Sequence, residues 1–300
     1  MSDLAALVAR ELQRPVTADI ATLATQLRQQ LGGAAVLFYG SALRTANLDG
    51  VLDFYVLRDE AERTGPPWAF LWPHVSYHEC EIGGRIIRAK VATMGIGTFA
   101  AAATGHSLDT TIWTRFAQPA RLLVPVSTRV AQAIADAVCA CVRTAARFAG
   151  ALGPDSGSAD DYWLALFAHT YRAELRIESH DRGRSVLSGD PAYYRDALRL
   201  AWRDIGLIGD ADTARLHPTM DAAPRRLWQR AWRRRAIAAK PLNALRLLRA
   251  ARTFDGAARY ALWKIERHSG IAIALTPWRE RHPILAAPGI LFHLWRVGGR

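Results

Sequence analysis

The sequence has little cysteine and no long apolar run. The first argues against a disulfide framework, and the second argues against a membrane-spanning helix. Three cysteines in 300 residues are an odd number without metal-ligand spacing. Cys139 and Cys141 stand two apart in an apolar helical stretch, so we interpret them as core residues and expect a reduced compartment. The N-terminus lacks the pattern of a secretory signal. No window reaches the roughly 18 uninterrupted apolar residues of a spanning helix, so we expect a soluble or peripheral protein.

Lysine is also scarce, and the charge is unevenly placed. Lys90 is the only lysine in the first 239 residues. From Asp221 to Arg300 there are 17 Lys+Arg against 4 Asp+Glu, whereas residues 1–220 hold 22 against 23. The formal net charge of +12 therefore belongs to the last quarter of the chain, where we expect a polyanionic partner to bind. The 50% of hydrophobic residues is enough for a proper core and excludes a disordered chain.

The hydrophobic periodicity changes near residues 125 and 220. Helical spacing over 2–31, broken at Pro15, predicts two helices, and the apolar runs at 34–40 and 50–57 predict buried strands. A hairpin is predicted around Gly83-Gly84, and residues 99–124 return to helical spacing. We therefore predict an α+β domain (1–125), a helical second domain for which a winged helix is one candidate form (126–220), and a basic, Trp-rich region (221–300).

The chemistry-bearing motif is Gly40-Ser41 at the end of one strand, followed by Asp53 in the middle of the next. Glycine lets the backbone approach a triphosphate, and the Ser41 hydroxyl and first helical N–H groups bind phosphate oxygens. A strand carboxylate can hold Mg²⁺, which orients the triphosphate for in-line attack. Nucleotidyltransferases of the polymerase-β kind have this layout, so we predict that residues 1–125 form a polymerase-β-like nucleotidyltransferase domain. The alternative is an ordinary Gly-Ser turn and a partly buried acid, but an unpaired buried carboxylate is costly and usually needs a cation.

The motif departs from the usual acid-x-acid pair of metal ligands. Asp53 is followed by Phe54 and Tyr55, so a second ligand must come from elsewhere. Asp49 in the preceding loop is our first candidate. Glu79 and Glu81 are two apart and share one strand face, which makes them further candidates. The alternative is that these two glutamates lie on a solvent-exposed edge of the hairpin and bind no metal.

The segment FYGSALRTANLDGVLDFYVL (38–57) resembles the core of the mitochondrial-type CDP-diacylglycerol synthases, the translocator assembly and maintenance family of phosphatidate cytidylyltransferases, here in a bacterial form. Further segments resemble that family in the same order along the chain. They are IIRAKVATM with Lys90, LDTTIWTRFAQPARLLV with Asp109, Trp113 and Arg121, TYRAELRIES with Tyr171, Glu174 and Arg176, and FDGAARYALWKIERHSG (254–270). Ala173 and Glu174 stand where the family has Gly and Asp.

The resemblance implies that CTP and phosphatidate give CDP-diacylglycerol and pyrophosphate, with Mg²⁺ as cofactor. It implies that Asp53 holds the metal and that Lys90 contacts a phosphate oxygen, while Gly40 and Ser41 bind the nucleotide. The substrate phosphate would be contacted by Tyr171, Glu174 and Arg176. Because a lipid phosphate is already an anion at pH 7, the reaction needs mostly alignment and charge neutralisation. For Lys90 and Arg176 the alternative is a surface ion pair.

The segment PRRLWQRAWRRR (224–235) holds six arginines and two tryptophans. Trp228 and Trp232 are four apart and share a helical face, as in an interfacial amphipathic helix. We therefore predict that residues 221–300 form a membrane-associating region that binds an anionic surface at the inner face of the cell membrane, and that the protein is otherwise cytoplasmic. The predicted membrane-binding residues are Trp228, Trp232, Arg233, Arg234 and Arg235. The alternatives are a solvated helix docked by its tryptophans or a nucleic-acid patch. We interpret the helix with Tyr260, Trp263 and Arg267 as core.

Three hypotheses for function remain open at this point. The first is the phosphatidate cytidylyltransferase, which the lipid-facing composition of the C-terminal region favours. The second is a nucleotidyltransferase with another acceptor, such as RNA, a small metabolite or a protein side chain. The third is a non-catalytic module that binds membrane or nucleic acid, which the missing acid-x-acid pair favours.

Overall fold

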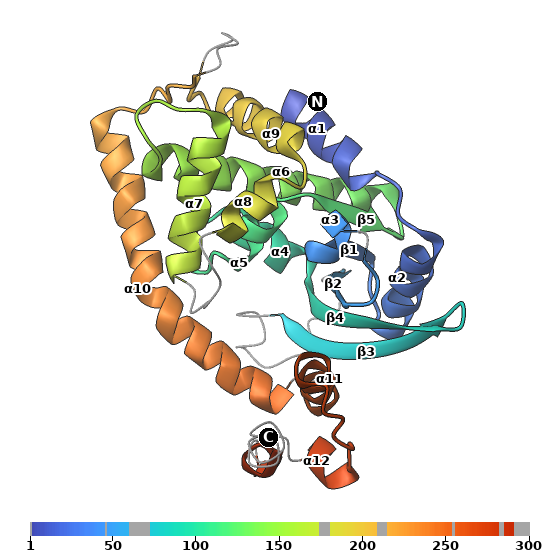
Figure 1. Ribbon diagram of the computed structural model, residues 1–300. Coiled ribbons are helices and arrows are strands. Elements are labelled where there is room, and N and C mark those ends of the chain that lie inside the picture. Colours follow the sequence, from blue (N-terminus) through green and yellow to red (C-terminus); the bar gives the residue numbers. More distant parts are fainter. Residues whose placement is uncertain are drawn as a thin grey trace.

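The chain has a mixed α+β fold in which helices pack around a five-stranded sheet (Figure 1). The computed structural model describes residues 2–45, 47–59, 73–173, 181–208, 215–253, 256–281 and 285–290. The strands are β1 (Ala35–Tyr39), β2 (Val51–Arg58), β3 (His74–Ile82), β4 (Arg85–Gly95) and β5 (Ala120–Leu123). The helices are α1 (Asp3–Leu12), α2 (Ala18–Gln30), α3 (Ser41–Thr45), α4 (Ile96–Ala103), α5 (Thr111–Phe116), α6 (Thr128–Leu152), α7 (Ala159–Ala173), α8 (Asp181–Leu187), α9 (Pro191–Asp204), α10 (Ala222–Thr253), α11 (Ala257–Ser269) and α12 (Pro277–Arg281).

The sheet has the strand order β3-β4-β2-β1-β5 and is mixed. Strand β2 pairs antiparallel with β1 and parallel with β4, and β3 and β4 form an antiparallel hairpin around Gly83-Gly84. The predicted helices at 2–31, both strands and the hairpin are confirmed. The continuous helical pattern expected over 99–124 is wrong at its end, because β5 adds an edge strand there that pairs antiparallel with β1.

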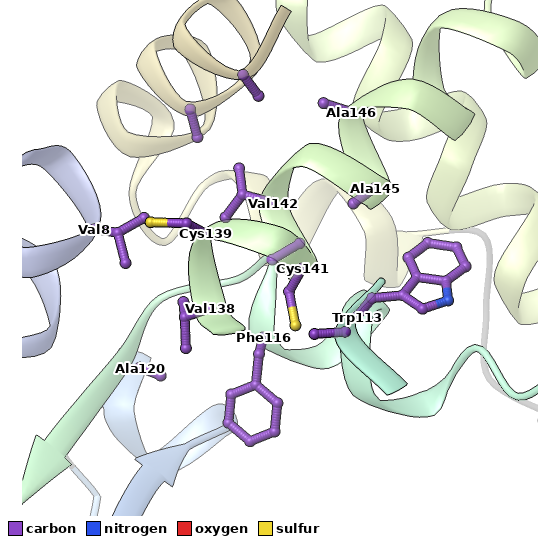
Figure 2. Close-up of a cluster of buried hydrophobic side chains, with 14 of the residues drawn as sticks. Val8, Trp113, Phe116, Ala120, Val138, Cys139, Cys141, Val142, Ala145 and Ala146 are labelled. Atoms are coloured by element: carbon purple, nitrogen blue, oxygen red, sulfur yellow. The ribbon is translucent and has the colours of Figure 1, made fainter. Parts of the chain in front are cut away.

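The two faces of the sheet belong to different clusters of buried side chains. Helix α2 and one face form a small cluster that includes Phe38 and Phe54. The opposite face joins a larger cluster whose centre is α6, with α1, α4, α5, α7, α9 and α10 packed around that helix. Figure 2 shows the middle of this cluster, where Cys139 points toward Val8. Cys139 and Cys141 are buried, as predicted, and burial raises the pKa of the Cys139 thiol to about 11.

The larger cluster crosses both predicted domain boundaries. It contains Leu37 of the sheet, Val142 of α6 and Trp232 of α10, so the regions expected to be separate domains share one hydrophobic core. In the described part of the chain after residue 125, the pairing between extended segments is limited to an isolated bridge between Gly157 and Leu216. These described residues therefore show no hairpin that could serve as the wing of a winged helix.

Helix α10 turns its tryptophans inward rather than toward solvent. The Trp232 side chain is 4% exposed, and its ring lies 5.7 Å from that of Phe148, while the Trp228 ring lies 5.2 Å from the same ring. Arg235 is also buried, and it donates to the carbonyl oxygen of Gly105. The predicted membrane contact of Trp232 and Arg235 is therefore wrong, because both side chains are buried, whereas Trp228 is half-buried where its ring meets Phe148.

The predicted lipid-facing residues that stay accessible are Arg233 and Arg234, both of which are exposed. Their neighbours on α10 show what the other arginines do. Arg225 and Gln229 donate to the carbonyl oxygens of Gly153 and Ala151, at 2.7 Å and 3.0 Å. These carbonyls lie at the C-terminal end of α6, where backbone acceptors lack partners within the helix. Part of the basic segment thus caps a helix instead of meeting a polyanion.

Candidate functional site

The end of β1 and the middle of β2 meet closely at Gly40. Tyr39 is the register partner of Asp53, and Gly40 follows with a φ of +94°. A Cβ atom at Gly40 would lie 2.8 Å from Oδ2 of Asp53. Helix α3 begins directly afterwards at Ser41. The chain therefore needs glycine here both for its backbone angle and for the approach of the turn to the carboxylate.

Lys90 lies beside Asp53 on the neighbouring strand. The two residues are register partners in the parallel β2–β4 pair, and Tyr77 of β3 is in turn the partner of Lys90. Register partners carry their side chains on the same face of a sheet. Tyr39, Asp53, Lys90 and Tyr77 thus form one row across four strands, which we call the Asp53 row. The sequence-predicted pair Asp53 and Lys90 is brought together, with Gly40 and Ser41 at the adjacent turn.

A further cation, which the sequence did not single out, lies next to this row. Arg115 of α5 sits over the Tyr39 ring, with its Cζ 5.2 Å from the ring centroid. Its Nη1 donates to the Tyr55 hydroxyl at 3.0 Å. Tyr55 is two residues beyond Asp53 on β2 and shares its face. The side of the row near Gly40 therefore carries a positive charge held in a fixed orientation.

Helix α11 closes the other side of the row by packing on β3. The rings of Tyr260 and Tyr77 lie 5.4 Å apart. Burial raises the pKa of the Tyr260 hydroxyl, and the nearby Asp53 carboxylate raises it further. The helix that we interpreted as core thus brings Tyr260 to the edge of the candidate site. Its spacing alone could not reveal this, because the contact joins residues far apart in the chain.

Trp263 fixes α11 to the sheet by lying between two arginines. The Cζ atom of Arg88 is 5.4 Å from the indole centroid, and that of Arg267 is 5.3 Å away. Arg267 also donates from Nη1 to the backbone oxygen of Asp49 at 2.7 Å. Cation–π contacts of this kind contribute roughly 0.5–1 kcal/mol each at exposed positions. The C-terminal region is therefore joined to the loop that leads into β2.

The candidates for a second metal ligand are engaged with arginines. The Asp49 carboxylate pairs with Arg85 at 3.2 Å, and Glu79 pairs with Arg88 at 3.4 Å while accepting from the Tyr77 hydroxyl at 2.9 Å. Glu81 is exposed near the hairpin turn. Within the described ranges there is no group of three or more His, Cys, Asp or Glu residues that could hold a metal ion. Asp53 would therefore fit Mg²⁺ only together with oxygens from a bound triphosphate, an arrangement common for this ion.

Four of the remaining residues matched by the resemblance lie in the described part of the chain. Asp109 accepts from the backbone and hydroxyl of Thr111, Trp113 is fully buried in the larger cluster, and Arg121 forms a buried ion pair with Glu11. Tyr171 lies on α7, with its ring 6.5 Å from that of Phe167. Glu174 and Arg176 lie outside the described residues. Asp109, Trp113 and Arg121 thus have local structural roles.

Comparison with known protein-family models gives no match, and no curated protein is significantly similar to the chain. In the described part of the chain, none of the helices combines the length and apolar character needed to cross a lipid bilayer. The chemistry of the Asp53 row must therefore be argued from the site itself.

The close approach at Gly40 gives a stability prediction. Gly40→Ala should destabilise the protein more than Gly83→Ala, because both glycines have positive φ but only the Gly40 methyl would meet Asp53. Adopting the left-handed conformation costs about 1–2 kcal/mol for either alanine. We expect the clash to add about 1 kcal/mol or more at Gly40. Urea unfolding of the two variants measures the difference, and equal losses of stability would show that the turn does not press on Asp53.

Proposed function

We propose that the protein is a nucleotidyltransferase that binds a nucleoside triphosphate at the Asp53 row. The observation that carries this proposal is the meeting of Gly40, at the end of β1, with Asp53 and Lys90, which are register partners on the adjacent strands β2 and β4. A glycine turn, a carboxylate and a cation are the groups needed to hold a triphosphate beside a divalent ion. The five-stranded mixed sheet with helices on both faces supports an α+β transferase domain but does not by itself select this chemistry.

Each residue has a separate role in this proposal. The turn at Gly40 and Ser41 would contact phosphate oxygens, and Lys90 and Arg115 would balance negative charge on opposite sides of Asp53. Asp53 would help to hold Mg²⁺, which when bound neutralises and orients the triphosphate. An oxygen of the acceptor phosphate attacks the α-phosphorus, the bond to the β-phosphate oxygen breaks, and pyrophosphate leaves. Because the acceptor oxygen is already anionic, no strong base is needed.

We further propose that the nucleotide is CTP and that the acceptor is phosphatidate, as the resemblance implies. The outward face of α10 supports a lipid acceptor. Leu227 and Ile237 are 63% and 77% exposed on that face. Exposed arginines surround them, namely Arg226, Arg230, Arg233 and Arg234. A helix face of this composition suits an anionic membrane surface, which would place the protein peripherally at the inner face of the cell membrane.

The reaction is tested by incubating purified protein with phosphatidate vesicles, Mg²⁺ and each α-labelled nucleoside triphosphate. We expect label from CTP to enter the lipid phase, with pyrophosphate formed only when divalent metal is present. Asp53→Asn should lower the rate by about two to four orders of magnitude, because metal-linked charge stabilisation supplies several kcal/mol. Asp49→Asn is the matched control, since its carboxylate is exposed and pairs with Arg85.

Unchanged turnover in folded Asp53→Asn protein would remove Asp53 from the site and refute the proposed mechanism. Label transfer to RNA or protein instead of lipid would support a nucleotidyltransferase with a different acceptor. If no label is transferred to any acceptor, the hypothesis of a non-catalytic binding module would replace the hypothesis of an enzyme.

Membrane binding gives a separate prediction. Replacing Leu227 and Ile237 together by Gln should weaken co-sedimentation with anionic vesicles, while the salt dependence set by the arginines remains. Val126→Gln is the control, because Val126 is 55% exposed but lies before α6, away from α10. Trp232→Ala should instead lower the free energy of unfolding by about 3–5 kcal/mol, as expected for a buried tryptophan.

Two results would contradict the proposal that the outward face of α10 binds the membrane. Full vesicle binding by the Leu227 and Ile237 double variant would show that α10 does not meet the membrane through that face. Tight binding to RNA or duplex DNA, with no binding to vesicles, would show that the exposed arginines bind nucleic acid instead of lipid.

A further inference from the structure

A cavity lies between the C-terminal half of α7 and the middle of α10. Its volume is about 400 Å³, within the range of small-molecule sites. Trp232, Ala236 and Ile237 of α10 form an apolar wall, and His169 and Arg172 of α7 face them. Lys240 completes the lining at the end toward the C-terminus of α10. None of these residues belongs to the Asp53 row.

The charged residues in the described lining of this cavity are basic. Arg172 and Lys240 are both exposed cations, and the described lining residues include no acid. Arg172 is oriented by its own helix, because its Nε donates to the carbonyl oxygen of Ala168 at 3.1 Å. A guanidinium and an ammonium group in the lining of one cavity attract an anion, and the guanidinium can bind a phosphate through two parallel hydrogen bonds.

The inner end of the cavity is apolar and rigid. The Trp232 ring is buried against Phe148 and Trp113, and the His169 ring meets it edge to face at 5.9 Å. Burial lowers the pKa of His169, and the neighbouring Arg172 lowers it further, which favours the neutral imidazole. The space beside Ala236 therefore suits an alkyl group better than water or a second charge.

We infer that this cavity binds one phosphate-headed lipid, with the phosphate between Arg172 and Lys240 and the first part of an acyl chain against Trp232 and Ala236. The position of Ile237 explains how the rest of the chain is accommodated. Ile237 lines the cavity and is also 77% exposed on the outer face of α10. A longer chain can thus leave the cavity along that face. Such binding requires neither CTP nor Asp53, so it can be measured apart from the proposed reaction.

Calorimetric titration with short-chain, monomeric lipids tests the inference. We expect dihexanoyl phosphatidic acid to bind at least about tenfold more tightly than dihexanoyl phosphatidylcholine, because the choline cancels the charge that the cations recognise. Inorganic phosphate should also bind at least about tenfold more weakly, because it lacks the alkyl part. Lys240→Gln and Arg172→Gln should each weaken phosphatidic acid about tenfold, as expected for loss of one charge-assisted hydrogen bond.

Three further variants make the test specific. Ala236→Trp should abolish binding by filling the cavity. Arg195→Gln should bind as wild type, because it removes an exposed arginine of α9 outside the cavity. Asp53→Asn should also bind as wild type, which separates this site from the catalytic proposal.

Equal affinity for the phosphatidic acid and phosphatidylcholine lipids would overturn the inference, as would unchanged binding in folded Ala236→Trp protein. Phosphate that binds as tightly as the lipid would leave a simple anion site and overturn the lipid assignment. Should Ala236→Trp fail to fold, the Arg172→Gln and Lys240→Gln double variant decides, since both positions are exposed. Retention of wild-type affinity by that variant would overturn the proposed head-group contacts.

Discussion

The candidate site depends on the placement of β2 between β1 and β4. Antiparallel pairing with β1 sets Asp53 opposite Tyr39, and parallel pairing with β4 sets it opposite Lys90. A slip of one residue in β2 would turn Asp53 toward the face covered by α2, where Phe38 and Phe54 now pack. The buried clusters on both faces therefore fix the position of Asp53 as well as the fold. Gly40 adds the second condition, because a side chain there would press against the carboxylate.

The C-terminal region contributes to this site as well as to the surface. Arg267 and Trp263 connect α11 to the loop before β2 and to β4, while Arg225 caps the end of α6 and Arg235 donates to a carbonyl beyond α4. Some of the basic residues of the last quarter thus make internal contacts, and others lie on the exposed face of α10. Lipid at that face and nucleotide at the Asp53 row would be bound by parts of one connected structure, since α10 and α11 both contact β3.

Local patterns in the sequence predicted the helices at 2–31, the first two strands and the hairpin, because their periodicity is a property of neighbouring residues. They also placed Asp53 on a strand after the Gly40 turn. They missed β5, whose four residues are set by pairing with β1, and they missed Tyr260, whose contact with Tyr77 is long-range.

The spacing of Trp228 and Trp232 correctly predicted a shared face. Spacing alone cannot tell whether such a face packs on lipid or on Phe148, and the structure shows the latter. Asp49 and Glu79, the candidates for a second metal ligand, pair with arginines, and the sequence could not reveal these pairs because they join separate segments of the chain.

The most direct test of the Asp53 row is equilibrium binding of a non-hydrolysable CTP analogue by calorimetry, with and without Mg²⁺. Wild-type protein should bind the analogue more tightly when Mg²⁺ is present. Asp53→Asn should lose this dependence on the metal, and Lys90→Gln should weaken binding about tenfold in both conditions, as expected for loss of one charged contact with phosphate. Identical affinities for the three proteins, unaffected by Mg²⁺, would contradict the assignment of a nucleotide site to this row.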